Sequence, residues 1–227
     1  MTTSGDRVEA RPGSPQQPAP PRRRGRPAAS GGPSTEASIL RSAREVFAES
    51  GYEGATFAEI AARAGVTRPA VNHYFAGKPA LYAAVFEATQ DGVVTVGLAR
   101  AAEATTSTER LGLFLETAAQ ADAGDRSFAR FIAASLVDAF RHPELADHAR
   151  RQIDDVRTFV RGTLETGMAA GEIRDDLELE PVTELLVAVM WGMGLYAGFV
   201  GTHDQLEAVV AQFERVLESV LVPSAPG

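Results

Sequence analysis

The chain of 227 residues contains no cysteine. This absence excludes thiol catalysis, cysteine-based zinc sites and a disulfide framework, and it is typical of chains kept in a reducing compartment. The four histidines, His73, His142, His148 and His203, do not show metal-ligand spacing. No glycine-rich phosphate loop follows a strand pattern, and no serine lies in a nucleophile elbow. We therefore expect no enzymatic activity, no metal and no cofactor.

Long apolar runs are also missing. The most apolar stretch, residues 185–200, is shorter than the roughly 20 residues needed to span a bilayer, and three glycines interrupt it. Arg22, Arg23 and Arg24 are not followed by an apolar run, so they do not begin a signal peptide. These features predict a cytoplasmic protein without a membrane partner, in which residues 185–200 form a buried helix.

The negative charge is unevenly distributed. Residues 1–33 carry a net charge of +4, residues 34–82 are neutral and residues 83–227 carry −12, which together give the net charge of −8. Phosphate attracts the basic end and repels the acidic remainder, so this distribution would orient the N-terminal end of the molecule toward nucleic acid.

Helical periodicity dominates the chain after residue 33. A first amphipathic helix is expected to end at Gly51, with Ile39, Ala43, Val46 and Phe47 on one face and Arg41, Arg44, Glu45 and Glu49 opposite. Capping residues, glycines and prolines delimit further helices at 57–64, 68–75, 79–104, 106–124, 127–140, 143–170, 181–200 and 204–221. No segment alternates as a strand. The expected fold is therefore all-α, with about nine helices.

The same pattern divides the chain into four parts. Residues 1–33 are rich in Pro, Gly, Ser and Arg and predict a disordered arm. Three short helices predict a helix-turn-helix DNA-binding domain at 34–82, and the longer helices predict a larger helical domain at 83–222. Residues 223–227 are expected to be a flexible tail.

The segment from Thr56 to Phe75 has the layout of a helix-turn-helix. Thr56 and Glu59 form a capping-box pattern, Gly65 provides the turn, and Thr67 caps the second helix. Helical geometry places one face of that helix inward, through Val66, Ala70, Val71 and Phe75. Its opposite face is then available to read DNA.

The side chains of this outer face suit base and phosphate contacts. Arg68 can form two hydrogen bonds with guanine, Asn72 can do the same with adenine, and Thr67 can contact phosphate or a thymine methyl. The predicted DNA-binding residues are Arg24 and Arg26 of the arm and Thr56, Thr67, Arg68, Pro69, Asn72, His73, Tyr74 and Lys78. Alternatively, Thr56 and Thr67 serve only as caps and His73 is simply exposed.

Residues 39–85 resemble the N-terminal signature of the TetR family of regulators. The resemblance is carried by Gly51 and Tyr52, Ile60 and Ala61, Ala64 to Val66, Tyr74 and Phe75, and Lys78. Asn72 departs from it, because the family often has a phosphate-contacting tyrosine there; the shorter Asn reaches either a base or nothing. The resemblance implies an all-helical homodimer of about nine helices per subunit whose last two helices form the interface. It also implies an operator-binding repressor, or alternatively an activator, that responds to a small-molecule effector, and it makes the helical domain at 83–222 the effector-binding and dimerisation domain.

Two further segments carry expectations. Arg24-Gly25-Arg26-Pro27 resembles the core of an AT-hook, and the alternative is a solvated basic tail that does not select sequence. Residues 181–221 are expected to form the homodimer interface, because the helix over 181–200 is apolar on nearly every side. Large apolar residues either line an effector pocket or only fill the core: Phe114, Phe128, Phe131, Phe159, Met168, Met190, Trp191 and Tyr196.

Together these patterns predict a regulator that binds a palindromic operator in double-stranded DNA as a homodimer and is released by a small molecule. Two other classes compete with this prediction. An architectural protein would bind all duplexes almost equally with strong salt dependence. A helical interaction module with a vestigial DNA-reading head would be unaffected by loss of Arg68.

Overall fold

The computed structural model describes residues 1–2, 34–123, 126–199 and 202–223. Regular secondary structure in these ranges is entirely helical, which confirms the all-α prediction. Contacts divide the chain into Met1–Gly32 and Pro33–Gly227, and every helix lies in the second unit. The predicted arm, with Arg24 and Arg26, and most of the predicted tail lie outside the described residues.

Three helices begin the folded chain, and local capping interactions explain where they begin and end. Ser34 accepts a hydrogen bond from the backbone of residue 37 at 3.1 Å where the first helix begins. Gly65 adopts a left-handed conformation (φ 68°, ψ 26°) at the turn between the second and third helices. The helices are α1 (Thr35–Gly54), α2 (Phe57–Ala64) and α3 (Arg68–Tyr74).

The remaining helices follow from residue 78 onward. The helix predicted over 79–104 is one continuous rod of three parts: α4 (Lys78–Gln90), a π-helical segment (Asp91–Thr95) and α5 (Val96–Ala101). A short 3-10 turn (Pro143–Leu145) precedes α8. The others are α6 (Ser107–Ala123), α7 (Ser127–Arg141), α8 (Ala146–Ala170), α9 (Leu179–Phe199) and α10 (His203–Leu221). Counted as rods, the helices of the described ranges correspond to the nine expected segments.

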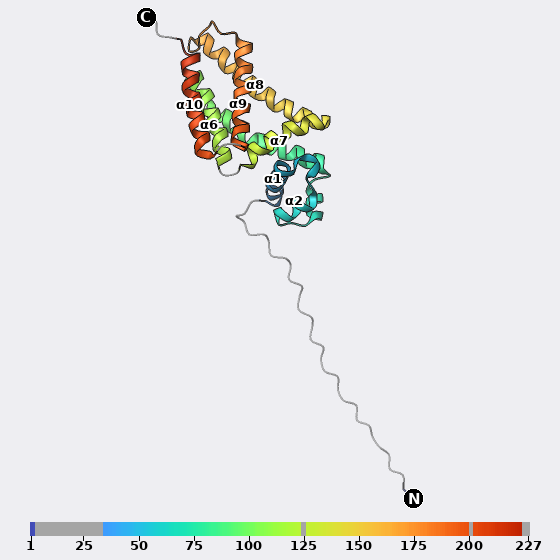
Figure 1. Cartoon of the computed structure of the whole chain (residues 1–227). Helices are drawn as coiled ribbons and strands as arrows, with labels where there is room; N and C mark the ends of the chain where they lie inside the picture. The colour runs from blue at the N-terminus through green and yellow to red at the C-terminus, as the bar shows by residue number, and fades with distance from the viewer. Residues whose placement is uncertain (3–33, 124–125, 200–201, 224–227) are drawn as a thin grey trace. The chain divides into compact units, whose positions relative to one another are not determined.

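Two hydrophobic clusters form the interior. One, the head cluster, joins α1 to α4 and includes Ile39, Phe47, Ile60 and Val71. The other, the body cluster, joins the π-helical segment and α5 to α6, α8, α9 and α10, which pack against one another in a bundle (Figure 1). The boundary expected between residues 82 and 83 falls inside α4, and the head cluster extends to Phe86, Phe131 and Leu145.

Helix α7 packs against both α1 and α9. This packing corrects the expectation that Arg44 lies on a polar outer face of α1. Arg44 is only 8% exposed, its Nε donates to Ser127 Oγ at 2.7 Å, and its guanidinium lies 3.6 Å from the centre of the Phe128 ring. Helix α7 therefore covers Arg44, whereas Arg41 and Glu49 of the same predicted face remain exposed, and the pattern of one helix does not reveal this difference.

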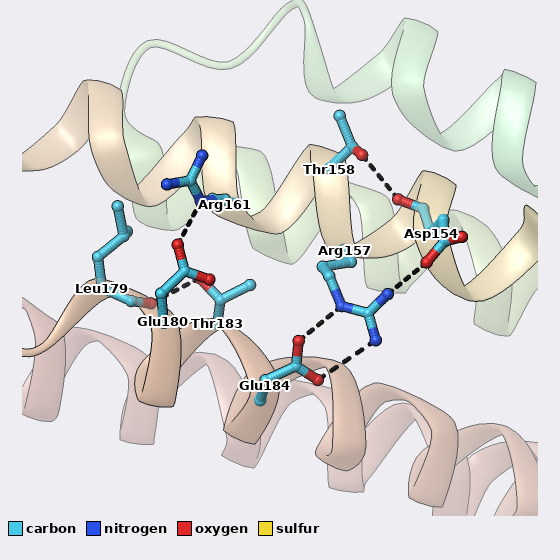
Figure 2. Close-up of polar contacts among 8 residues, drawn as sticks. All are labelled: Asp154, Arg157, Thr158, Arg161, Leu179, Glu180, Thr183 and Glu184. Atoms are coloured by element: carbon cyan, nitrogen blue, oxygen red, sulfur yellow. Dashed lines mark hydrogen bonds and ion pairs between the residues drawn. The ribbon is translucent and has the colours of Figure 1, made fainter. Parts of the chain in front are cut away.

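Ion pairs align α8 with α9 (Figure 2). Arg157 of α8 donates to both carboxylate oxygens of Glu184 and also pairs with Asp154, and Arg161 donates to Glu180 at 2.8 Å. These side chains are partly exposed, so each pair contributes little stability. Their effect is to define the register between two helices that both line the cavity described below.

Helix α9 is long and strongly apolar. It is the one helix among the described ranges that is long and apolar enough to cross a bilayer, and 44% of its most apolar stretch is buried within the subunit. Leu185, Leu195 and Phe199 of this helix are exposed. Part of α9 thus belongs to the core, and part forms an uncovered apolar surface.

Candidate DNA-reading helix and ligand cavity

Helix α3 presents one anchored face and one exposed face. Val71 and Phe75 are buried in the head cluster, and Val66 packs against it. Four of the predicted reading residues lie exposed on the other side: Arg68, Pro69, Asn72 and His73. The short helix is therefore held by its apolar residues, and its polar side chains project to solvent.

The arginines of this region differ in what they bind. Arg63 is occupied, because its guanidinium donates to Glu49 at 2.9 and 2.6 Å and to Glu59 at 2.8 Å. Arg68 forms no ion pair with the part of the chain that the structure describes. Its donors therefore remain available to an external acceptor, whereas those of Arg63 hold α1 against α2.

The flanking residues Tyr74 and Lys78 occupy different environments. Tyr74 is 44% exposed, and its ring lies edge-on to His73 with the ring centres 5.6 Å apart. Lys78 is half-buried; its Nζ donates to the carbonyl of Glu53 at 3.1 Å and lies 4.7 Å from the centre of the Tyr52 ring. Sequence reasoning missed this contact, through which Lys78 connects α4 to the end of α1.

Both threonines act as caps. Thr56 Oγ1 accepts from the amide of Glu59 at 3.2 Å, and Thr67 Oγ1 accepts from the amide of Ala70 at 3.3 Å. The Glu59 carboxylate, expected to complete a capping box, pairs with Arg63 instead. Thr56 and Thr67 are exposed, so the caps leave both residues accessible to a DNA backbone.

Helix α1 has a kink, and the backbone at this kink is hydrogen-bonded to α7. Gly51 breaks the helical conformation with φ 67° and ψ 178°, and the amide of the next residue, Tyr52, donates to Asp138 Oδ2 at 2.9 Å. Asp138 is 6% exposed. Burial raises the pKa of its carboxyl, and the hydrogen bond from the Tyr52 amide opposes that rise.

Substituting Gly51 tests the kink. Gly51→Ala should lower the free energy of unfolding by about 1–3 kcal/mol, because only glycine adopts this backbone conformation without strain. Urea denaturation would measure the change. Gly162→Ala is the matched control: a Cβ at this mid-helix position meets nothing within 4 Å, so it should raise stability by about 0.5–1 kcal/mol. Equal effects of the two substitutions would contradict a strained kink.

A cavity of about 130 Å³ lies among the helices of the body. Four of the predicted pocket residues line it: Phe114, Phe128, Met190 and Trp191. The other lining residues are mostly apolar: Val93, Val94, Leu115, Ala118, Ala119, Ala129, Ile132, Gln152, Val156, Met193, Gly194, Ala197, Leu206 and Val210.

Other predicted pocket residues do not line this cavity. Phe131 is fully buried in the head cluster, and Met168 and Tyr196 pack against the body cluster. Phe159 packs against Phe114, with ring centres 4.7 Å apart. The periodicity that marks these residues as apolar does not distinguish the core from a cavity wall, because both are lined by the same residue types.

Two residues that line the cavity carry polar atoms without partners. Gln152 Oε1 and Trp191 Nε1 are buried and form no hydrogen bond within the described part of the chain. Nearby arginines bind elsewhere: Arg126 and Arg130 donate to the carbonyls of Ala197 and Gly198 near the end of α9, at 2.5 and 2.9 Å. Gln152 was not predicted from the sequence, since its position on an amphipathic helix looks like an ordinary polar residue.

The described ranges hold no cluster of three or more histidine or acidic side chains able to bind a metal.

Family models match two parts of the chain. Residues 39–85 match the model for bacterial regulatory proteins of the tetR family, and residues 107–222 match the C-terminal model of BetI-type transcriptional repressors. The chain belongs to the TetR family. It is a transcriptional regulator with a DNA-binding helix-turn-helix.

Known TetR-type proteins resemble it along most of their length. The transcriptional repressor AcnR of Corynebacterium diphtheriae is 28% identical over 184 residues, which cover 80% of this chain and 90% of AcnR. A TetR regulator from Chloroflexus aurantiacus superposes with a TM-score of 0.71 at 22% identity, over 84% of this chain and 97% of that one. FadR of Bacillus subtilis, solved with stearoyl-CoA, gives 0.67 at 23% identity, over 80% and 97%. The last two structural similarities show that this chain shares the fold of those regulators.

One side chain of this TetR-family protein touches both the cavity and the head. Phe128 lines the cavity, and the guanidinium of Arg44, on α1 of the head, lies over its ring. The π-helical segment contributes as well, since a Cβ at Gly92 would lie 3.3 Å from Phe128 Cε1. Phe128 therefore contacts both the cavity and a side chain of α1.

Proposed function

We propose that the protein is a homodimeric repressor that binds a palindromic operator through α2 and α3 and leaves it when a small molecule occupies the cavity. The observation that carries this proposal is the outer face of α3. Arg68 and Asn72 are exposed there, while Val71 and Phe75 anchor the opposite face. Arginine and asparagine are the side chains best suited to bidentate contacts with guanine and adenine in the major groove.

Uncovered apolar residues on the last two helices support the homodimer. Leu185, Leu195 and Phe199 are exposed on α9, and Val209, Val216 and Val220 are exposed on α10. The three valines recur at helical spacing, so they form one stripe along α10. Two copies pairing through these stripes would bury them and set two reading helices about 34–36 Å apart, one turn of DNA.

The connection between cavity and head supports release by an effector. A ligand that shifts Phe128 would disturb Arg44, and α1 is also held to α7 by the hydrogen bond between Tyr52 and Asp138. To weaken operator binding, such a change need only alter the distance between the two reading helices of the dimer. A coupling free energy of about 1–3 kcal/mol would reduce operator affinity by roughly 5- to 150-fold. The protein would act in the cytoplasm, where its operator is.

Selection of bound duplexes from a random DNA pool tests the proposal. The purified full-length protein, at near-physiological salt, should enrich a palindrome whose half-sites lie about 10 base pairs apart. Enrichment of a single half-site would contradict the dimer. Enrichment of any A·T-rich duplex, or of none, would contradict sequence-specific regulation and favour an architectural role or a vestigial head.

A further inference from the structure

We infer that the cavity binds a small, uncharged, largely apolar molecule that carries one hydroxyl group, with a phenol-sized ring as its simplest form. This inference rests on the proposed function, because it names the class of effector. It follows from three properties of the cavity: its size, its lack of charge and its two unpaired polar atoms.

The size of the cavity matches a ligand of about one ring. The cavity measures about 130 Å³, close to the roughly 150 Å³ of an engineered apolar cavity that admits benzene. The rings of Phe114 and Phe128 form part of its wall. Aromatic walls favour a flat ring, which can pack edge-on or offset against them.

The lining excludes an ionised ligand. No lining residue is Lys, Arg, His, Asp or Glu, and Arg126 and Arg130 are engaged with carbonyls at the end of α9. A carboxylate or phosphate inside this wall would lose its hydration without gaining a counter-charge, which is strongly unfavourable.

The unpaired atoms specify the polar group. Gln152 Oε1 is an acceptor without a donor, and Trp191 Nε1 is a donor without an acceptor. The Gln152 side chain is more than nine-tenths buried, so its desolvation has already occurred on folding. A hydroxyl can donate to an acceptor such as Gln152 Oε1 or accept from a donor such as Trp191 Nε1, and either hydrogen bond would satisfy an atom that has no partner within the described part of the chain.

The single tryptophan of the chain makes the inference measurable. Because Trp191 lines the cavity, every change in tryptophan fluorescence reports on this site. We would titrate the full-length protein with phenol, toluene and benzoate, which share a ring but carry a hydroxyl, a methyl and a carboxylate respectively. The expected order of affinity is phenol, then toluene, with no saturable response to benzoate.

Gln152→Leu provides the decisive variant. It should weaken phenol binding by about threefold to tenfold, through loss of one hydrogen bond, and should strengthen toluene binding. Gln120→Leu, on the exposed surface of α6, is the matched control and should change neither affinity. Equal affinities for phenol and toluene, tightest binding of benzoate, or an unchanged phenol affinity in Gln152→Leu would each overturn the inference.

Operator release is measured separately, so that the two proposals fail differently. Phenol should dissociate the protein from its selected duplex in a fluorescence-anisotropy titration. Saturable binding of phenol without release supports the ligand class and contradicts the release step of the proposed function. If the protein selects a palindrome but does not bind phenol, the inferred ligand class is wrong. The proposed DNA recognition is unaffected by that result.

Discussion

Arg68→Ala should reduce affinity for the selected operator by roughly 30-fold to 10⁴-fold. One bidentate contact between arginine and guanine contributes about 1–3 kcal/mol of discrimination, and a palindrome contains two such contacts. The substitution should not unfold the head, because Arg68 is exposed and forms no ion pair within the described ranges. Anisotropy titrations of the labelled operator and of a scrambled duplex would measure the effect.

The control for this variant is Arg150→Ala, which removes the same charge from α8. Arg150 is 73% exposed at its side chain and, within the described ranges, pairs only with Asp147, three residues earlier, so its loss should cost almost nothing. A uniform loss of affinity on both duplexes would assign Arg68 to a phosphate contact. No loss on either duplex would contradict α3 as the reading helix.

Val216→Glu should convert the homodimer to a monomer. Val216 is 44% exposed in the isolated subunit and lies in the apolar stripe of α10. In a symmetric interface the substitution buries two unpaired charges, each costing roughly 3–5 kcal/mol, so dimerisation should weaken by roughly 10⁴-fold to 10⁷-fold. Size-exclusion chromatography with light scattering would measure the mass, and operator affinity should fall with it.

Val137→Glu is the matched control, with the same change of side chain at a valine of α7 that is 50% exposed. It should leave the dimer intact. Circular dichroism of both variants would establish that each remains helical. A monomeric wild-type protein, or equal dissociation by both variants, would contradict an interface formed by α9 and α10.

The sequence by itself determined the positions of the helices. Their ends are encoded locally: Thr67 caps α3, Gly65 adopts the left-handed turn before it, and Thr106 with Glu109 exchanges hydrogen bonds at the start of α6. Such signals act over three or four residues, so they can be recognised without knowing the fold. The inward and outward faces of α3 follow from the same short-range periodicity.

Only the tertiary structure decided which residues meet across the chain. Arg44 looks like a surface residue until α7 covers it. Gln152 of α8 looks ordinary until four other helices and the π-helical segment contribute apolar residues to the same cavity. Likewise, Phe114 and Phe128 line the cavity, whereas Phe131 fills the head cluster. These differences depend on packing between segments far apart in sequence. Periodicity within one helix shows that a face is covered, but the covering element is determined only when the whole chain packs.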